Sequence, residues 1–215
     1  MDEPQPTIKV RREDLDALRW VGQQYACPLD QLQIVMGRLR GHTRVGGTIA
    51  LQATTRWEKL GLAVHRQFVE RERPWVWATT TGLRMAGLPY TVVEPKAWSL
   101  PHLQAVNRVR LFVDPRRAGA VWRPERELRT AVVTRDQPVP DAEIHDVGGN
   151  VIAVEVEVSP KSAAERRRKM LALVERYDSI WYFASADAWL GVHDAACQVP
   201  PHLADLVRIY PLEDT

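Results

Sequence analysis

The sequence has few cysteines and no long apolar run, and each shortage excludes a class of protein. The two cysteines, Cys27 and Cys197, stand far apart without partners at metal-ligand spacing, so we expect free thiols in the reducing cytoplasm. No apolar run approaches the roughly 20 residues of a membrane helix. The charged, proline-bearing first residues are not typical of a signal peptide. We therefore expect a soluble cytoplasmic protein that does not contact a membrane.

The net charge is also small, +2 from 29 Lys and Arg against 27 Asp and Glu. The total charge therefore does not indicate a nucleic-acid-binding protein. Arginine far outnumbers lysine, however, and gathers in a few segments, so the distribution of charge indicates local sites for anions. The 215 residues, of which 45% are hydrophobic, suffice for one large domain or two small ones.

Apolar residues recur at helical spacing in three segments of the first half. They predict amphipathic helices over 12–26, 28–39 and about 48–60. Two strand-like runs, LAVHRQFV and PWVWATT, follow and are joined by ERER, and TTGLRMAG predicts a further short helix after capping threonines. Three helices and a two-stranded ribbon are the order of a winged helix-turn-helix. In that arrangement the third helix enters the major groove and the turn of the ribbon lies along the DNA backbone.

Polar residues of the predicted third helix and arginines of the ribbon are candidate contacts to double-stranded DNA. Guanidinium groups suit phosphates, although Glu70 and Glu72 weaken the positive field of the ribbon. A winged helix that contacts only proteins is the alternative. The candidate DNA-binding residues of this half are Thr54, Thr55, Arg56, Lys59, Arg66, Arg71 and Arg73.

The segment YTVVEPKAWSLP has two prolines, mixed polarity and no clear period, which is typical of a linker. We place a domain boundary near Pro95, so that residues 1–95 form the winged helix-turn-helix domain and 96–215 a second domain. A basic helix is predicted from Pro101 or His102 to about Val113. We expect a structural or capping role for His102, because no second His or Cys stands nearby at ligand spacing.

The second half alternates predicted helices and strands. Pro124 predicts the start of a helix that carries Glu125 and Glu127. PDAEIHDVGGNVIAVEVEV predicts two strands joined by a tight turn at Gly148–Asn150. A helix from Ser162, a strand SIWYFA, a helix near 187–196 and a last strand VRIYPL follow. This order predicts an α/β (α+β) fold with helices around a mixed sheet.

The second of the paired strands carries acidic residues at alternate positions. By the two-residue period, Ala153, Glu155 and Glu157 share the face opposite to Ile152, Val154, Val156 and Val158. One interpretation is a half-buried strand with a solvated acidic face. The other is a nuclease site, because carboxylates hold the cation that activates water and a lysine stabilises developing negative charge. Asp141 upstream and Lys161 downstream suit that second interpretation.

The same residues resemble the motif of the PD-(D/E)xK restriction-endonuclease-like superfamily. The resemblance implies that Asp141 and Glu155 bind Mg²⁺ or Mn²⁺, and that Glu127, or less favourably Glu125, is the extra acid of resolvase-like members. Glu157 stands where the motif has its lysine, so Lys161 is the alternative lysine and catalysis stays open. The candidate catalytic residues are Asp141, Glu155, Glu157, Lys161 and Glu127.

Eight segments spread from about Leu15 to Leu212 together resemble the replication-relaxation family of actinobacteria, which is found beside plasmid and mobile-element genes. They are LRWVGQQYACPLDQL, WVWATTTGLRMAGLPY, HLQAVNRVRL, WRPERELR, PDAEI, AVEVEVSPKS, RYDSIWYF and VRIYPL. The resemblance implies a winged helix fused to a nuclease-like domain, acting in replication or transfer of mobile DNA.

Two main functions stay open from the sequence. The first is a metal-dependent DNA endonuclease or nickase, in which basic residues of the helix after Ser162 also contact the DNA backbone. These residues are Arg166 and Arg167, with Arg168 and Lys169 beside them. The second is a catalytically inactive accessory or regulatory protein that binds DNA and uses the nuclease-like fold for docking. A module that binds only proteins of the mobile element is a weaker third option, and a homodimer is a plausible arrangement on DNA.

Overall fold

The computed structural model describes residues 10–70, 72–131, 137–159 and 161–215. The chain divides into two compact units, residues 1–98 and 99–215. This division falls in the same proline-bearing segment in which we placed the boundary at Pro95. Among the described residues, no helix combines the length and the apolar character that crossing a bilayer requires.

The first unit contains three helices followed by an antiparallel ribbon. Its elements are α1 (Arg12–Gln23), β1 (Cys27–Pro28), α2 (Leu29–Arg38), α3 (Gly47–Lys59), β2 (Ala63–Arg66), β3 (Trp75–Ala78) and α4 (Thr80–Met85). Strand β3 lies between β1 and β2 and pairs antiparallel with both. The core is formed by apolar side chains from every helix and from β3, including Leu18, Leu32, Trp57, Val76 and Leu83.

Helix α4 begins where the sequence predicts it. The hydroxyl of Thr79 accepts a hydrogen bond of 3.1 Å from the backbone N–H of Gly82. This bond satisfies one of the N–H groups that a helix leaves unpaired in its first turn. The threonine directly before TTGLRMAG therefore caps the helix, as expected.

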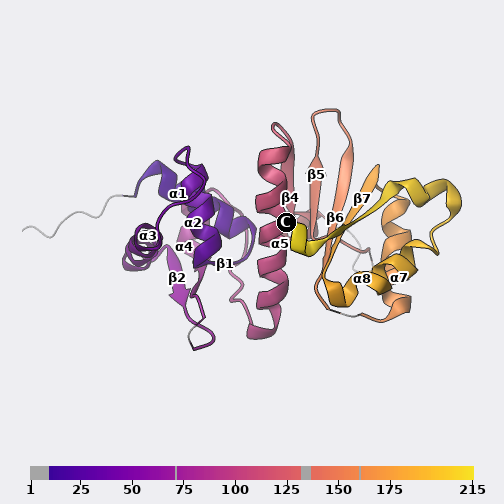
Figure 1. Cartoon of the computed structure of the whole chain (residues 1–215). Coiled ribbons are helices and arrows are strands. Elements are labelled where there is room, and N and C mark those ends of the chain that lie inside the picture. Colours follow the sequence, from indigo (N-terminus) through magenta and orange to yellow (C-terminus); the bar gives the residue numbers. More distant parts are fainter. Residues whose placement is uncertain (1–9, 71, 132–136, 160) are drawn as a thin grey trace, which may run out of the picture. The chain divides into compact units, whose positions relative to one another are not determined.

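The second unit is a five-stranded sheet with helices on both faces (Figure 1). Its elements are α5 (Leu100–Val113), β4 (Val121–Pro124), α6 (Glu125–Ala131), β5 (Ala142–His145), β6 (Val151–Glu157), α7 (Ala163–Val174), β7 (Ser179–Ala184), α8 (Ala186–Ala196) and β8 (Val207–Pro211). Short 3₁₀ turns lie at Ala97–Ser99, Asp114–Arg116, Pro201–Leu206 and Leu212–Asp214.

The sheet has the order β4-β5-β6-β7-β8, in which β4, β5 and β6 are antiparallel while β6, β7 and β8 are parallel. The predicted mixed sheet is therefore confirmed. The sequence did not predict β4, because a four-residue strand that ends at Pro124 has no alternation long enough to recognise. Its pairing with β5 defines it instead.

Two apolar layers hold the second unit together, one on each face of the sheet. On one face, Val109 and Val113 of α5 pack with Val154 of β6 and Phe183 of β7. On the other face, side chains of α7 and α8 pack against Ala153, Ile180 and Tyr182. Strand β6 is therefore covered on both sides, and this determines the environment of its two glutamates.

Candidate active site

Glu155 and Glu157 lie inside the protein. Their exposed fractions are 2% and 3%, because α7 and α8 cover the sheet face to which Ala153 belongs. The interpretation of a solvated acidic strand face is therefore wrong. A buried carboxylate is unfavourable unless it is paired, protonated or bound to a cation, so the partners of these two residues decide what the site can do.

Asp141 lies beside β6 and both of its oxygens have partners. The backbone N–H of Val156 donates to Oδ2 at 2.8 Å, and Nε2 of His102 lies 3.2 Å from Oδ1. Burial alone raises the pKa of Asp141, but His102, the charge of Lys169 and the N–H of Val156 together lower the pKa to about 2. Asp141 is thus an anion near neutral pH. In turn, burial opposes the charged form of His102, but Asp141 raises the pKa of that histidine above its ordinary value.

Glu155 is paired with a lysine from the following helix. Nζ of Lys169 on α7 lies 2.7 Å from Oε2 of Glu155. Burial nevertheless raises the pKa of Glu155 to about 8, with Lys169 opposing the rise and Asp141 adding to it. Burial lowers and Glu155 raises the pKa of Lys169, and the net change is upward. Near neutral pH the glutamate therefore accepts a proton readily, whereas the lysine keeps its charge.

Glu157 has a different lysine as its partner. Nζ of Lys161 lies 3.1 Å from Oε2 of Glu157. The side chain of Lys161 is 38% exposed, whereas that of Glu157 is 4% exposed. Lys161, which we expected near Asp141 and Glu155, thus contacts Glu157 instead. Lys169 provides the direct ion pair to Glu155, and a position 14 residues after Glu155 lies outside any local motif.

Three buried oxygen atoms at this face accept no hydrogen bond from a described residue. They are Oε1 of Glu155, Oε1 of Glu157 and the hydroxyl of Tyr182. Tyr182 stands opposite Glu155 in the pairing of β6 with β7, and burial, then Glu155, raises the pKa of its hydroxyl. Unpaired buried acceptors are rare in proteins and call for an explanation. A cation or a bound hydrogen-bond donor would satisfy the two carboxylates.

The donor set fits a hard cation in its chemistry. Carboxylate oxygens are the ligands that Mg²⁺ prefers, and it commonly takes only one or two of them while keeping several waters. Asp141 and Glu155 supply such a pair. Within the described parts of the chain, no group of three or more His, Cys, Asp or Glu side chains is arranged to hold a metal ion. A cation at this site would therefore depend on two carboxylates, backbone oxygens and water.

Glu127 belongs to a second polar cluster, which also includes Arg123 and Glu143. Nε of Arg123 donates to Oε1 of Glu127 at 2.8 Å, and the same guanidinium contacts Glu143 at 3.2 Å. The extra acid of α6 that acts on the site is Glu125, whose charge raises the pKa of both His102 and Lys169. Of the two glutamates on α6, Glu125 is therefore the one whose charge reaches His102 and Lys169, whereas Glu127 is paired with Arg123.

The predicted basic surface of α7 is also only partly exposed. Arg166 is buried, with Nη2 donating to the backbone oxygen of Lys161 at 3.3 Å, and a Cβ atom on Gly191 would stand 2.5 Å from its Nη1. This arginine therefore packs α7 against α8 and does not face solvent. Arg167 and Arg168 are exposed, as a surface that contacts DNA requires.

On α3 the helical period separates the four residues predicted to contact DNA into buried and exposed positions. Thr54 is fully buried and its hydroxyl donates to the carbonyl of Leu51 at 2.9 Å, so its predicted groove-facing position is corrected. Arg56 is half-buried and its Nη2 contacts Oδ1 of the buried Asp14 at 2.6 Å. Arg56 therefore ties α3 to α1. Thr55 and Lys59 are exposed.

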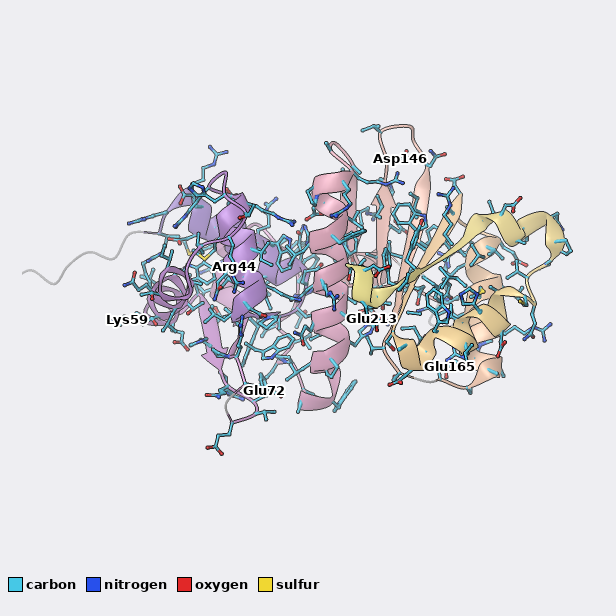
Figure 2. All side chains as sticks on the ribbon, in the orientation of Figure 1. Arg44, Lys59, Glu72, Asp146, Glu165 and Glu213 are labelled. Atoms are coloured by element: carbon cyan, nitrogen blue, oxygen red, sulfur yellow. The ribbon has the colours of Figure 1, made fainter. Side chains whose placement is uncertain are left out.

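The exposed side of α3 forms a shallow hollow of about 420 Å³. Its lining residues are Leu51, Gln52, Thr55, Arg56 and Lys59, and Figure 2 shows Lys59 at this helix. Sequence reasoning missed Gln52, which the helical period places one turn before Arg56. Amide and hydroxyl groups at such positions can hydrogen-bond to base edges.

The ribbon arginines are engaged with acidic side chains. Arg66 contacts Glu94 and lies over the ring of Trp77, 5.5 Å from its centroid. Arg73 lies 3.2 Å from Asp30. Both guanidinium groups stay more than half exposed, so these ion pairs are readily exchanged for phosphate. Arg71 lies outside the described residues.

Comparison with protein-family models, with curated proteins and with solved structures finds no match for this chain. The arrangement of Asp141, Glu155, Lys169 and His102 is therefore interpreted from its own geometry and chemistry.

Proposed function

We propose that this protein binds double-stranded DNA and cleaves one of its phosphodiester bonds with the help of Mg²⁺ or Mn²⁺, as an endonuclease or nickase. The observation that carries the proposal is the environment of Glu155. It is a buried carboxylate with one oxygen on Lys169 and the other without a hydrogen-bond donor among the described residues, beside the ionised Asp141. A site that gathers negative charge inside the protein is suited to a cation.

The residues of the site have separate roles in this proposal. Asp141 and Glu155 would hold the metal, which when bound makes a phosphate more electrophilic and a water more acidic. His102 fixes the orientation of Asp141 through Oδ1. Lys169 keeps a positive charge at Glu155 in a region of low solvent access, where it can stabilise negative charge on a phosphate. Lys161 and Glu157 form a second pair that can orient water.

The first unit supports the DNA-binding part of the proposal. Three helices, a ribbon and the additional strand β1 follow the order of a winged helix-turn-helix. The exposed Thr55 and Lys59 on α3 would enter the major groove. Arg66, the last residue of β2, and Arg73, which comes shortly before β3, would contact phosphates.

The proposal includes membership of the replication-relaxation family, with a restriction-endonuclease-like second domain and a role in replication or transfer of plasmids or other mobile elements. The resemblance of the eight sequence segments supports it, as does the sheet in which β6 carries Glu155 between an antiparallel and a parallel neighbour. Other proteins of the mobile element, and a second copy of this chain on a symmetric DNA site, are the proposed partners.

A second candidate function is an inactive accessory or regulatory protein that binds DNA. Both oxygens of Asp141 already have partners, and Lys169 already neutralises Glu155. Such a self-neutralised cluster can stabilise the fold without any metal. Glu157, at the position of the motif lysine, favours the same alternative.

Nicking of a supercoiled plasmid separates the two functions. The active-site proposal predicts open-circular product with Mg²⁺ or Mn²⁺ and none with EDTA, and loss of activity in Asp141→Asn and Glu155→Gln. Glu175→Gln, which changes an exposed carboxylate at the end of α7, is the matched control and is expected to stay active. Wild-type protein that binds DNA but gives no product with either metal would instead support the accessory function.

A further inference from the structure

A second cavity lies beside the acidic site, between α6, residues 137–139 and α7. Its volume is about 600 Å³. Its walls are lined by Arg129, Gln137, Pro138, Val139, Glu165, Arg168, Lys169 and Ala172. All of these residues belong to the second unit, and none of them except Lys169 takes part in the site described above. Glu165 marks the α7 side of this region in Figure 2.

The charge of this cavity suits an anion. Three cationic side chains, Arg129, Arg168 and Lys169, line it with one carboxylate, Glu165. Arg129 is 60% exposed and shares its charge with Glu125 at 2.6 Å. Arg168 is exposed and forms no ion pair with a described residue. Planar guanidinium groups bind phosphate oxygens through two parallel hydrogen bonds.

Lys169 connects the cavity to the acidic site. It lines the cavity, and its Nζ lies 2.7 Å from Oε2 of Glu155. Val139, another lining residue, is followed directly by Pro140 and Asp141. Lys169 therefore lines the cavity and at the same time contacts a carboxylate of β6.

We propose that this cavity binds a phosphate group of a nucleic-acid strand, with Arg168 at its rim and Lys169 at its inner end. The proposal deepens the proposed function and rests on it, because the phosphate would be one neighbouring the bond that Asp141 and Glu155 act on. A strand suits the cavity better than a single free phosphate, since the exposed Arg167 extends the positive charge of α7 beyond the cavity lining. Several neighbouring positive charges match a nucleic-acid strand, which carries a phosphate at every nucleotide.

The first test uses inorganic phosphate as the probe and thermal denaturation of the full chain in EDTA, at constant ionic strength set with sodium chloride. Phosphate is expected to raise the Tm of the wild type progressively, because it binds only the folded state. Arg168→Ala is expected to weaken the apparent phosphate affinity about tenfold, the effect of one charge-assisted hydrogen bond. Arg208→Ala removes the same charge from an exposed position on β8, outside the cavity, and is expected to keep the wild-type response.

The second test measures the fluorescence anisotropy of a labelled oligonucleotide, single-stranded or duplex, at several salt concentrations in EDTA. Arg168→Ala is expected to reduce the slope of log affinity against log salt by about 0.7 on a single strand and about 0.9 on a duplex. Arg208→Ala is expected to leave the slope unchanged. Equal slopes for the two variants, with phosphate binding still lost in Arg168→Ala, would overturn the assignment to a nucleic-acid strand in favour of a small phosphate ligand.

Failure of this inference is distinguishable from failure of the proposed function. A wild type that gains no stability from phosphate, while Mg²⁺ still stabilises it through Asp141 and Glu155, would overturn the phosphate cavity alone. Arg168 is exposed, so its replacement is expected to leave the Tm without phosphate unchanged. A lower Tm of Arg168→Ala in the absence of phosphate would overturn the assignment of Arg168 as a binding residue.

Discussion

Two acidic clusters lie on the same face of the same sheet, and they differ in how completely their carboxylates are satisfied. Glu143 on β5 accepts from Arg123 at 3.2 Å, from His145 at 2.8 Å and from the hydroxyl of Tyr177 at 2.8 Å. Glu155 on β6 is less exposed, and among the described residues its one ion-pair partner is Lys169. The first cluster is complete as it stands, whereas the second has buried oxygens without donors in the described structure. Incomplete pairing, and not acidity itself, distinguishes the candidate site.

The largest effect is expected on the nicking rate, from replacement of the lysine that contacts Glu155. Lys169→Ala removes the cation that contacts Glu155, and we expect it to lower the nicking rate by about 10²–10³-fold, as for loss of one group that stabilises a transition state. Lys161→Ala removes a half-exposed cation from Glu157, and we expect a loss of about tenfold with metal binding intact. Initial rates of plasmid nicking measure both, and a larger effect from Lys161→Ala would reverse the assignment.

For the stability of the fold, the larger effect is expected at Glu143 and the smaller one at Glu155. Glu143→Gln removes the negative charge and one of the two acceptor oxygens that serve Arg123, His145 and Tyr177, so we expect a loss of about 2–3 kcal/mol in the free energy of unfolding. Glu155→Gln near neutral pH replaces a carboxyl group that readily holds a proton, and its change is expected to stay within about 1 kcal/mol. Urea denaturation in EDTA compares the two. Equal losses would mean that both clusters are structural.

The pH dependence follows from the raised pKa of Glu155. Its value of about 8 in the folded protein exceeds the ordinary value of about 4.3 in the unfolded chain. The stabilising contribution is therefore complete below about pH 4 and is lost as pH rises through about 8. The slope approaches at most about 1.4 kcal/mol per pH unit. Urea denaturation in EDTA across this range is expected to show a steeper decline for the wild type than for Glu155→Gln, and identical slopes would contradict the raised pKa.

Much of the fold could be predicted from the sequence because the signals are local. Helical spacing marked α1 and α2, threonines marked the start of α4, and the Gly148–Asn150 turn marked the β5–β6 hairpin. Strand β4 could not be predicted, since its four residues acquire their conformation only by pairing with β5.

The site was less predictable than the fold. Alternation along β6 correctly separated its two faces, but it could not reveal that α7 and α8 bury the acidic one. Lys169 and His102 reach the carboxylates from other helices, so no spacing near Glu155 indicates them. On α3, a rotation of one residue decides whether a threonine is buried, as Thr54 is, or exposed, as Thr55 is.

A smaller effect is expected on α3. Lys59→Ala removes an exposed cation, and the slope of log affinity for duplex DNA against log salt is expected to fall by about 0.9. Arg84→Ala, an exposed change on α4 of the same unit, is the matched control and is expected to keep the slope. Arg56→Ala is less informative, because it also breaks the contact with Asp14. Fluorescence anisotropy at several salt concentrations measures the slopes, and a fall as large for Arg84→Ala would remove α3 as the DNA-reading helix.

The most direct test of the central claim is thermal denaturation of the full chain with and without Mg²⁺ or Mn²⁺, in the wild type, Glu155→Gln and Glu143→Gln. We expect the metal to stabilise the wild type by about 1.4 kcal/mol at ten times its dissociation constant. Glu155→Gln is expected to lose this gain, and Glu143→Gln to keep it despite its lower Tm. A wild type whose Tm does not change at millimolar metal, with or without DNA, would contradict a metal site at Asp141 and Glu155.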